Sequence, residues 1–437
     1  MKQKAMVVAL TGVLAACAVA VSATAAETSP PDYSIIDLPS LGGTASQGSS
    51  INTFGLIAGY SNLPGNQVAH AAAWWFGSKY DLDTLGGANS AVEWPVKNEF
   101  GVISGIAQTS QPNPPGEHWS CQAFFNYDGH TCLGFVWKSG KMIPLQPLPG
   151  GYNSFATGTN NRFQTVGWAE TGFHDPSCNS NPDDGFVQVL QFLPVTWGPN
   201  PGQIGALPLE AGDDSGAATA VNDSGEVVGI SGSCDQAVGR YTARHMVLWK
   251  DGKAIDLGNI GGDAWNTPMA INRQGDVVGF AGITPGPNPV LHAFFRGHAG
   301  GPPVDLGVLQ LGDISEALGI NDRGQVVGLS CGPGETDGCH GFLWQDGVMT
   351  DLDSFAPNYQ GVLEDAQDIN DLGQITGQAL DASGNLVAFL ATPVPGYGNR
   401  STRTTHSNRG TLSRRQRVEL ARRLGLAGVA MLQSGHP

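Results

Sequence analysis

The sequence predicts an all-β fold, a seven-bladed β-propeller of four-stranded antiparallel blades, on three observations. Gly makes up 62 of the 437 residues and Pro 28, and each Gly inside a helix is destabilising by roughly 0.5–1 kcal/mol relative to Ala. The chain is 41% hydrophobic and only 14% charged, a composition that excludes a disordered protein. A strand-rich unit recurs seven times, and repeated units of four strands are typical of propellers.

The repeat is defined by an Asn that ends one apolar segment, with a Gly seven residues later. The unit reads Ile-Asn-x-x-Gly-x-Val-Val-Gly and is clearest from Ile320 to Gly328. The repeated Asn residues are Asn52, Asn98, Asn160, Asn222, Asn272, Asn321 and Asn370. Two units are degenerate, because Lys97 and Thr159 replace the Ile and Phe163 occupies the position of the first Gly. The Asn-x-x-Gly step predicts a tight turn in which Gly supplies positive φ.

Each unit continues with a strand of the type His340 to Trp344, a polar turn, and an apolar strand that ends in Asp-Leu, as at Asp351. Alternating apolar residues and frequent β-branching indicate four short strands per unit. The strand His residues recur at one blade position: His70, His245, His292 and His340. Other units place Leu133, Leu193 or Val387 there, so we expect packing or a hydrogen bond to the Asp of the Asp-Leu strand, and no metal site.

The two ends of the repeat array are complementary. The last unit stops after its third strand, near Phe389, and lacks the Asp-Leu strand. An unattached Asp-Leu strand spans residues 33–38. Because proteins avoid unpaired strand edges, we expect residues 33–38 to complete the last blade and close a ring over residues 33–392.

The His-Ala-Phe step at residues 292–294, the Leu-Gly-Gly links such as Leu41 to Gly43, and the Ala-Ile-Asn-x-x-Gly-x-Val-Val-Gly unit resemble the bacterial HAF-repeat family of probable extracellular repeat proteins. The resemblance covers Tyr33 to about Thr392. It implies an extracytoplasmic repeat protein and supplies no established reaction or catalytic residue.

The N-terminus predicts export. Lys2 and Lys4 precede an apolar run, and Ala23-Thr24-Ala25 fits a cleavage site, so residues 1–26 are interpreted as a signal peptide. The protein is then secreted or periplasmic. The alternative is a membrane-anchored lipoprotein, because Leu14-Ala15-Ala16-Cys17 resembles a lipoprotein box with Cys17 as the lipidated residue.

The six Cys residues that follow residue 26 suit an oxidising compartment, where an even count suggests disulfides. Proximity in sequence favours Cys121–Cys132 and Cys331–Cys339 as pairs, which leaves Cys178–Cys234.

Charge is distributed unevenly along the chain. The formal net charge is −16, yet residues 394–437 contain eight Arg and one acidic residue. The acidic body excludes nonspecific nucleic-acid binding, and we expect a monomer.

The C-terminal segment is expected to lie outside the ring. Residues 393–410 are interpreted as a polar linker, and residues 411–437 as a basic, helix-compatible tail that could touch an anionic surface.

Long insertions after the second strands of units two and three should lie on one face, from Ile106 to about Cys132 and from Trp168 to about Phe192. Aromatic residues beside carboxylates suit sugar stacking or a protein partner, so this face is the predicted ligand site. The candidate residues are Glu117, His118, Trp119, Phe125, Tyr127, Trp168, Glu170, His174 and Asp175.

We therefore expect an exported binding module for a glycan or protein ligand, without an identified catalytic motif or cofactor. Two alternatives stay open: a polysaccharide hydrolase or lyase that uses carboxylates on the same face, and a structural envelope or matrix protein. A divalent cation is a weaker possibility at carboxylates beside the Gly-rich links: Asp213, Asp214, Asp263 and Asp313.

Overall fold

The computed structural model describes residues 31–394 apart from 96, 118–120, 122–123, 126–127, 176, 179–186, 201, 235–241, 287–288, 310–313 and 333–337. The predicted signal peptide, Cys17, most of the linker and the basic tail lie outside these residues. No helix among the described residues is long and apolar enough to cross a membrane.

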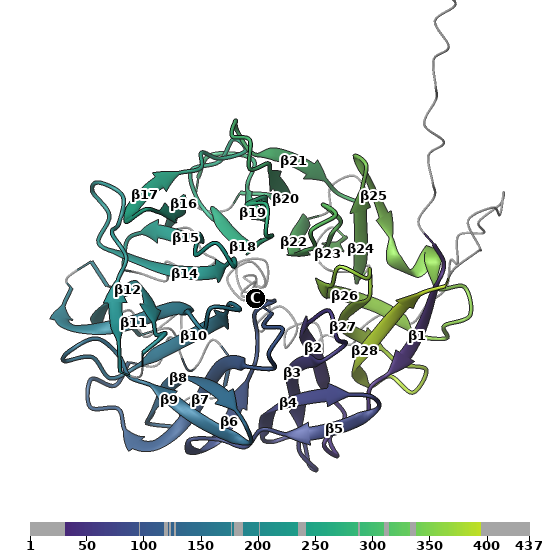
Figure 1. Ribbon diagram of the computed structural model, residues 1–437, viewed down its shortest axis with the longest axis horizontal. Coiled ribbons are helices and arrows are strands. Elements are labelled where there is room, and N and C mark those ends of the chain that lie inside the picture. The colour runs from purple at the N-terminus through teal and green to yellow at the C-terminus, as the bar shows by residue number, and fades with distance from the viewer. Residues whose placement is uncertain are drawn as a thin grey trace, which may run out of the picture.

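The described chain forms seven four-stranded antiparallel sheets arranged as the blades of a propeller around one axis (Figure 1). Blade 1 consists of β2 (Ser46–Ile51), β3 (Ile57–Asn62), β4 (Ala69–Trp75) and β5 (Ser78–Asp81). Blade 2 consists of β6 (Gly86–Ala91), β7 (Ile103–Pro112), β8 (His130–Lys138) and β9 (Lys141–Leu145). Blade 3 consists of β10 (Ser154–Thr159), β11 (Thr165–His174), β12 (Leu190–Trp197) and β13 (Ile204–Ala206). Blade 4 consists of β14 (Ser215–Val221), β15 (Val227–Gly232), β16 (Ala243–Lys250) and β17 (Lys253–Asp256). Blade 5 consists of β18 (Thr267–Ile271), β19 (Val277–Gly282), β20 (Leu291–Arg296) and β21 (Val304–Gly307). Blade 6 consists of β22 (Ile314–Ile320), β23 (Val326–Cys331), β24 (Cys339–Gln345) and β25 (Val348–Asp351). The short 3₁₀ helix η3 (Leu352–Phe355) follows, and blade 7 is β26 (Val362–Ile369), β27 (Ile375–Leu380), β28 (Leu386–Pro393) and β1.

Strand β1 (Tyr33–Asp37) closes the ring, as the sequence predicts. It is the outermost strand of blade 7 and pairs antiparallel with β28, from Tyr33 opposite Pro393 to Asp37 opposite Phe389. In Figure 1 the purple N-terminal strand lies beside the yellow-green C-terminal one. The N-terminal segment therefore supplies the fourth strand that the last repeat lacks.

The seven repeated Asn residues hold neighbouring blades together. In each turn the Asn Oδ1 accepts backbone N–H groups of its own turn, as Asn321 does from Arg323 and Gln325. Each Asn Nδ2 donates to the backbone carbonyl of the equivalent Asn in the next blade, at 2.7–3.3 Å. The seven bonds form a closed circle, because Asn370 of blade 7 donates to Asn52 of blade 1.

Because the Asn turns follow the innermost strands, they lie on one face of the ring, called here the Asn-turn face. The loops between second and third strands lie on the opposite, long-loop face. The insertions of blades 2 and 3 are shorter than the sequence predicts, because β7 runs to Pro112 and β11 runs to His174. Trp168, Glu170 and His174 are consequently strand residues, since the β11–β12 hairpin continues through Glu170 opposite Phe192.

The largest buried apolar cluster spans most of the blades. It takes residues from blades 1 to 6, including Tyr60, Trp94, Phe155, Trp265 and Leu318. The cluster therefore joins these six blades to one another. The other clusters lie between adjacent sheets, as expected for strands buried on both faces.

The three predicted disulfides are present: Cys121–Cys132, Cys178–Cys234 and Cys331–Cys339. The pair Cys331–Cys339 joins neighbouring strands within blade 6, opposite each other in the β23–β24 register. The pair Cys178–Cys234 links the segment after β11 to the segment after β15 and so joins blades 3 and 4. Three disulfides indicate a non-reducing setting, extracellular or periplasmic.

Candidate functional site

The predicted ligand residues of the long-loop face are largely buried. Glu117, Phe125, Trp168, Glu170 and Asp175 are all at most 5% exposed, whereas His174 is exposed. His118, Trp119 and Tyr127 lie outside the described residues. In this conformation the buried five contribute to packing and internal hydrogen bonds, and ligand binding by this face stays a prediction.

Glu117 and Glu170 form a buried carboxyl pair that fastens the two insertions. Glu117 Oε1 accepts hydrogen bonds from the backbone of Val189, at 2.8 Å, and of Leu190. Glu170 accepts from the side chain and backbone of Asn153 at 2.8–3.0 Å. Burial raises the pKa of both carboxyl groups, and the Glu117 charge helps to raise the pKa of Glu170 to about 8. The hydrogen bonds of the pair tie the blade 2 insertion to blade 3.

Trp168 belongs to a buried aromatic cluster. Its ring stacks on Phe155 at a centroid distance of 4.2 Å and meets Trp94 edge-on at 5.7 Å. Phe124, from the blade 2 insertion, packs against Phe155 at 4.9 Å. The aromatic residues of the insertions thus anchor them to the core.

The strand His residues form the predicted hydrogen bonds in two blades. The Nδ1 of His70 lies 2.9 Å from Asp81, and that of His292 lies 2.8 Å from Asp305, each on the outer strand. His245 instead contacts Asp213 at 2.8 Å, one of the carboxylates considered for a cation. Asp214 and Asp263 bond to Ser177 and Gly286, and Asp313 lies outside the described residues.

A cavity of about 410 Å³ opens at the ring centre on the Asn-turn face and is called the mouth pocket. Its charged lining residues are Lys97, Glu99, Asp223, Arg273, Asp322 and Asp371, so carboxylates outnumber cations by four to two. Phe54 and Thr53 also line it. The lining comes from most of the blades, and closure of the ring is what brings these residues together.

The carboxylates of the mouth pocket are fixed by backbone hydrogen bonds between blades. They belong mainly to the residue that follows the repeated Asn, and each accepts the N–H of its counterpart in the preceding blade. Thr53 donates to Glu99 at 3.1 Å, Asn161 to Asp223 at 2.9 Å, and Asp322 to Asp371 at 2.9 Å. These contacts pre-organise a ring of acceptors around the pocket.

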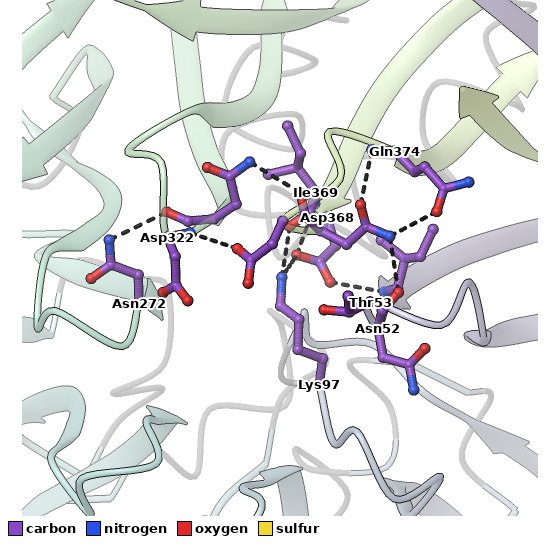
Figure 2. A network of polar contacts seen from close by, with 12 residues as sticks. Asn52, Thr53, Lys97, Asn272, Asp322, Asp368, Ile369 and Gln374 are labelled. Atoms are coloured by element: carbon purple, nitrogen blue, oxygen red, sulfur yellow. Dashed lines mark hydrogen bonds and ion pairs between the residues drawn. The ribbon is translucent and has the colours of Figure 1, made fainter. Parts of the chain in front are cut away.

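Lys97 reaches across the pocket to a different blade. Its Nζ donates to Asp368 Oδ1 at 2.7 Å and to the carbonyl of Ile369 at 2.8 Å (Figure 2). Asp368 is fully buried on β26, and its other oxygen accepts the backbone N–H of Ile51. Burial raises the pKa of Asp368 to about 6, and Lys97 opposes that rise. Lys97 thereby links blades 2 and 7 across blade 1.

Arg273 is the second cation of the mouth pocket. Its backbone N–H and Nε donate to the two oxygens of Asp322, at 2.9 and 2.8 Å. Its Nη2 also pairs with Asp322 and lies 3.6 Å from Asp371. Because Lys97 and Arg273 both have carboxylate partners, the remaining charge in the pocket is negative.

Aromatic side chains lie in the turns of the Asn-turn face, and Phe54 among them lines the mouth pocket. Phe54 is 67% exposed and Phe100 is 69% exposed. Phe163 packs on Phe100 at 5.6 Å and lies beneath the Lys138 ammonium at 4.7 Å. Phe163 has φ +60°, while the equivalent residue of the other six turns is a Gly with φ between +71° and +95°. The left-handed conformation costs a Phe about 1–2 kcal/mol, so this position retains an aromatic ring at the expense of stability.

The sequence signals Lys97, Asp368 and Phe163 only as departures from the repeat. Lys97 replaces the usual Ile, and Asp368 occupies a position that holds Ala in blades 4 and 5. Pairing these departures with each other would have predicted the Lys97–Asp368 contact. The place of Lys97 in the mouth pocket requires the closed ring and the register of each turn.

The fold and the mouth pocket define the chain as a closed seven-bladed β-propeller with a pre-organised polar pocket at one end of its axis. No family model and no curated protein matches the chain. Solved structures are similar to parts of the chain at low identity. They include a gluconolactonase from Xanthomonas campestris (18% identity over 47% of this chain and 69% of that one, TM-score 0.28) and an acylaminoacyl peptidase from Pyrococcus horikoshii (12% over 74% and 48%, TM-score 0.40). The β-propeller domain of the trilobed protease of Pyrococcus furiosus is a third (9% over 70% and 81%, TM-score 0.28).

Proposed function

We propose that this protein is an exported binding module that takes a neutral or amino-sugar unit of a glycan at the mouth pocket. The observation that carries the proposal is the pocket itself, a cavity of about 410 Å³ with fixed charged walls and one exposed aromatic side chain, Phe54. Its volume lies within the range of about 300–1,000 Å³ that small-ligand sites occupy.

The chemistry of the lining favours hydroxyl and ammonium groups. The carboxylates of Glu99, Asp223 and Asp371 accept hydrogen bonds from both groups, and the excess of negative charge disfavours anionic sugars. Phe54 offers a ring face on which the apolar side of a sugar can stack.

Export is part of the proposal. The predicted signal peptide at residues 1–26 and the three disulfides support a secreted or periplasmic protein, with lipidation at Cys17 as the alternative. The resemblance to HAF repeats agrees with this location.

The long-loop face keeps a separate prediction of ligand contact. Among the described candidates there, His174 is exposed, and Glu117, Phe125, Trp168 and Glu170 are buried. We therefore place the ligand at the Asn-turn face and use His174 as the control for the opposite face.

The test is a glycan array followed by calorimetric titration of neutral and amino-sugar oligosaccharides into the exported chain. Phe54→Ala is expected to weaken binding at least tenfold, because it removes the stacking surface. Glu99→Gln is expected to weaken amino-sugar binding and to affect neutral sugars less, because it removes a charge and keeps an acceptor. His174→Ala is expected to leave both affinities unchanged.

Two results would contradict the proposal. Loss of affinity in His174→Ala together with full affinity in Phe54→Ala and Glu99→Gln would move the ligand to the long-loop face. Release of reducing sugars from the bound glycan, abolished by a single acidic substitution, would favour the polysaccharide-cleaving alternative.

A further inference from the structure

The strand His of blade 6 differs from its equivalents in the other blades. In blades 1 and 5 the His Nδ1 lies 2.8–2.9 Å from one outer-strand Asp, a hydrogen-bond distance. In blade 6 the Nδ1 of His340 faces two carboxylates, at 3.5 Å from Asp351 Oδ2 and 3.6 Å from Asp353 Oδ2. Both distances exceed that of a hydrogen bond, and this buried Nδ1 has no hydrogen-bond partner in the described part of the chain.

The second carboxylate comes from a local feature that only blade 6 has among the described residues. Strand β25 ends at Asp351 and runs directly into η3, which carries Asp353. Asp351 caps η3, since its Oδ1 accepts the Asp353 N–H at 2.9 Å, and Asp353 Oδ1 accepts the Leu363 N–H at 3.3 Å. One oxygen of each carboxylate is thus fixed by backbone, and the other is turned toward His340.

We propose that His340, Asp351 and Asp353 form a binding site for a divalent transition-metal ion of the Zn²⁺ class. The three ligand atoms lie within 4.8 Å of one another. Two donors at Zn²⁺ bond lengths of about 2.1 Å and a tetrahedral angle are about 3.4 Å apart, close to the spacing around His340. A set of one imidazole and two carboxylates suits Zn²⁺ better than Ca²⁺ or Mg²⁺, which take oxygen ligands only.

A second buried acid points toward the same place. Glu364, on the inner strand β26 of blade 7, is 2% exposed, and its Oε2 has no hydrogen-bond partner among the described residues. Glu364 lies close enough to His340 for the charges of the two side chains to interact. A cation bound at His340 would also offset the negative charge of the Glu364 carboxylate. Glu364 would then support the site from outside the set of ligands.

Access and charge balance both permit an ion. His340 and Asp351 have side chains 29% and 40% exposed, so the cluster lies near the surface on the long-loop face. A divalent cation would neutralise the Asp351 and Asp353 carboxylates around a neutral imidazole. An imidazolium in the same place would compensate only one of them.

The ion would act structurally. It would join β24, β25 and η3 of blade 6 beside the inner strand of blade 7, the blade that closes the ring. Its position on the long-loop face makes it independent of the mouth pocket and of the proposed glycan site.

The experiment uses tag-free protein, stripped of metal with a chelator and titrated with Zn²⁺ by calorimetry and thermal shift. We expect one ion per chain and a higher melting temperature on binding. His340→Ala and Asp353→Asn should each weaken Zn²⁺ affinity at least tenfold, and affinity should rise from pH 5.5 to 7.5 because the ion competes with the His340 proton.

The matched control is His292→Ala, which removes the equivalent His of blade 5 and should leave stoichiometry and affinity unchanged. If Asp353→Asn does not fold, His340→Gln gives the same readout without touching the η3 cap. Absence of stoichiometric Zn²⁺ binding by folded protein would overturn the proposal. Undiminished binding in the His340 variants, or equal binding of Ca²⁺, would also overturn it.

Discussion

Lys97 stands where four of the other repeats have Ile, and its partner Asp368 stands where others have a small residue. Lys97→Ile should restore the repeat consensus and still destabilise the protein, because it leaves a buried carboxylate without its cation. Breaking a buried ion pair in this way costs about 3–5 kcal/mol at pH 8. The loss should be smaller at pH 5, where Asp368 takes up a proton.

Urea unfolding at the two pH values measures this difference. The double variant Lys97→Ile with Asp368→Ala should be more stable at pH 8 than Lys97→Ile alone. Equal stability of Lys97→Ile and the parent at pH 8 would show that the pair makes no net contribution.

Glu316 is a second buried acid on an inner strand, and both of its carboxyl oxygens lack hydrogen-bond partners among the described residues. Burial raises the pKa of Glu316 from 4.5 to about 8. The folded state therefore binds a proton that the unfolded state has released, and stability falls between those two pH values by about 1.4 kcal/mol per pH unit at most.

Glu316→Gln should melt at the parent's temperature near pH 4.5 and above it at pH 9. Thermal melts across this range test the sign of the effect. A variant that melts at or below the parent's temperature at pH 9 would contradict it.

At the scale of the turn, each repeated Asn combines a local bond and a bond to the next blade. Asn321→Ala removes both the turn acceptor and the donor to the Asn370 carbonyl, at 3.0 Å, and leaves buried backbone groups unpaired. The expected cost is about 2–4 kcal/mol. Asn321→Asp keeps the turn acceptor but turns a carboxylate oxygen toward the Asn370 carbonyl, so it should be at least as destabilising as Asn321→Ala.

Urea midpoints of the three proteins test this order. Parent-like stability of Asn321→Asp would mean that the bond between blades contributes nothing. The closed circle of seven such bonds would then not be what selects Asn at this position.

The blades were predictable because each strand and turn is encoded locally and repeated seven times. The Asn-x-x-Gly turn, the strand at His340 and the strand at residues 33–38 are all where the periodicity predicts. The long hairpin of blade 3 was not, because the repeat does not encode the extension of β11 to His174, which pairs with Leu190 of β12. The mouth pocket was missed since Glu99 and Asp371 are ordinary turn residues until the ring brings them together.

The whole molecule depends on β1 as the last strand of the ring. A chain that starts at Pro39 should lose the β1–β28 pairing and the burial of Tyr33 and Leu38, at a cost of about 2–5 kcal/mol. The exposed edge of β28 should also promote association.

The matched control is a chain that starts at Tyr33, which differs only by the strand itself. Melting temperature and light scattering measure both effects. Identical melting and identical size for the two chains would show that the ring does not need β1 for closure.

The most direct test of the account is a crystal structure with a bound neutral or amino-sugar oligosaccharide. The account predicts a sugar ring stacked on Phe54 with its polar groups within hydrogen-bond distance of Glu99 or Asp371. A glycan bound only at the long-loop face beside His174 would contradict it.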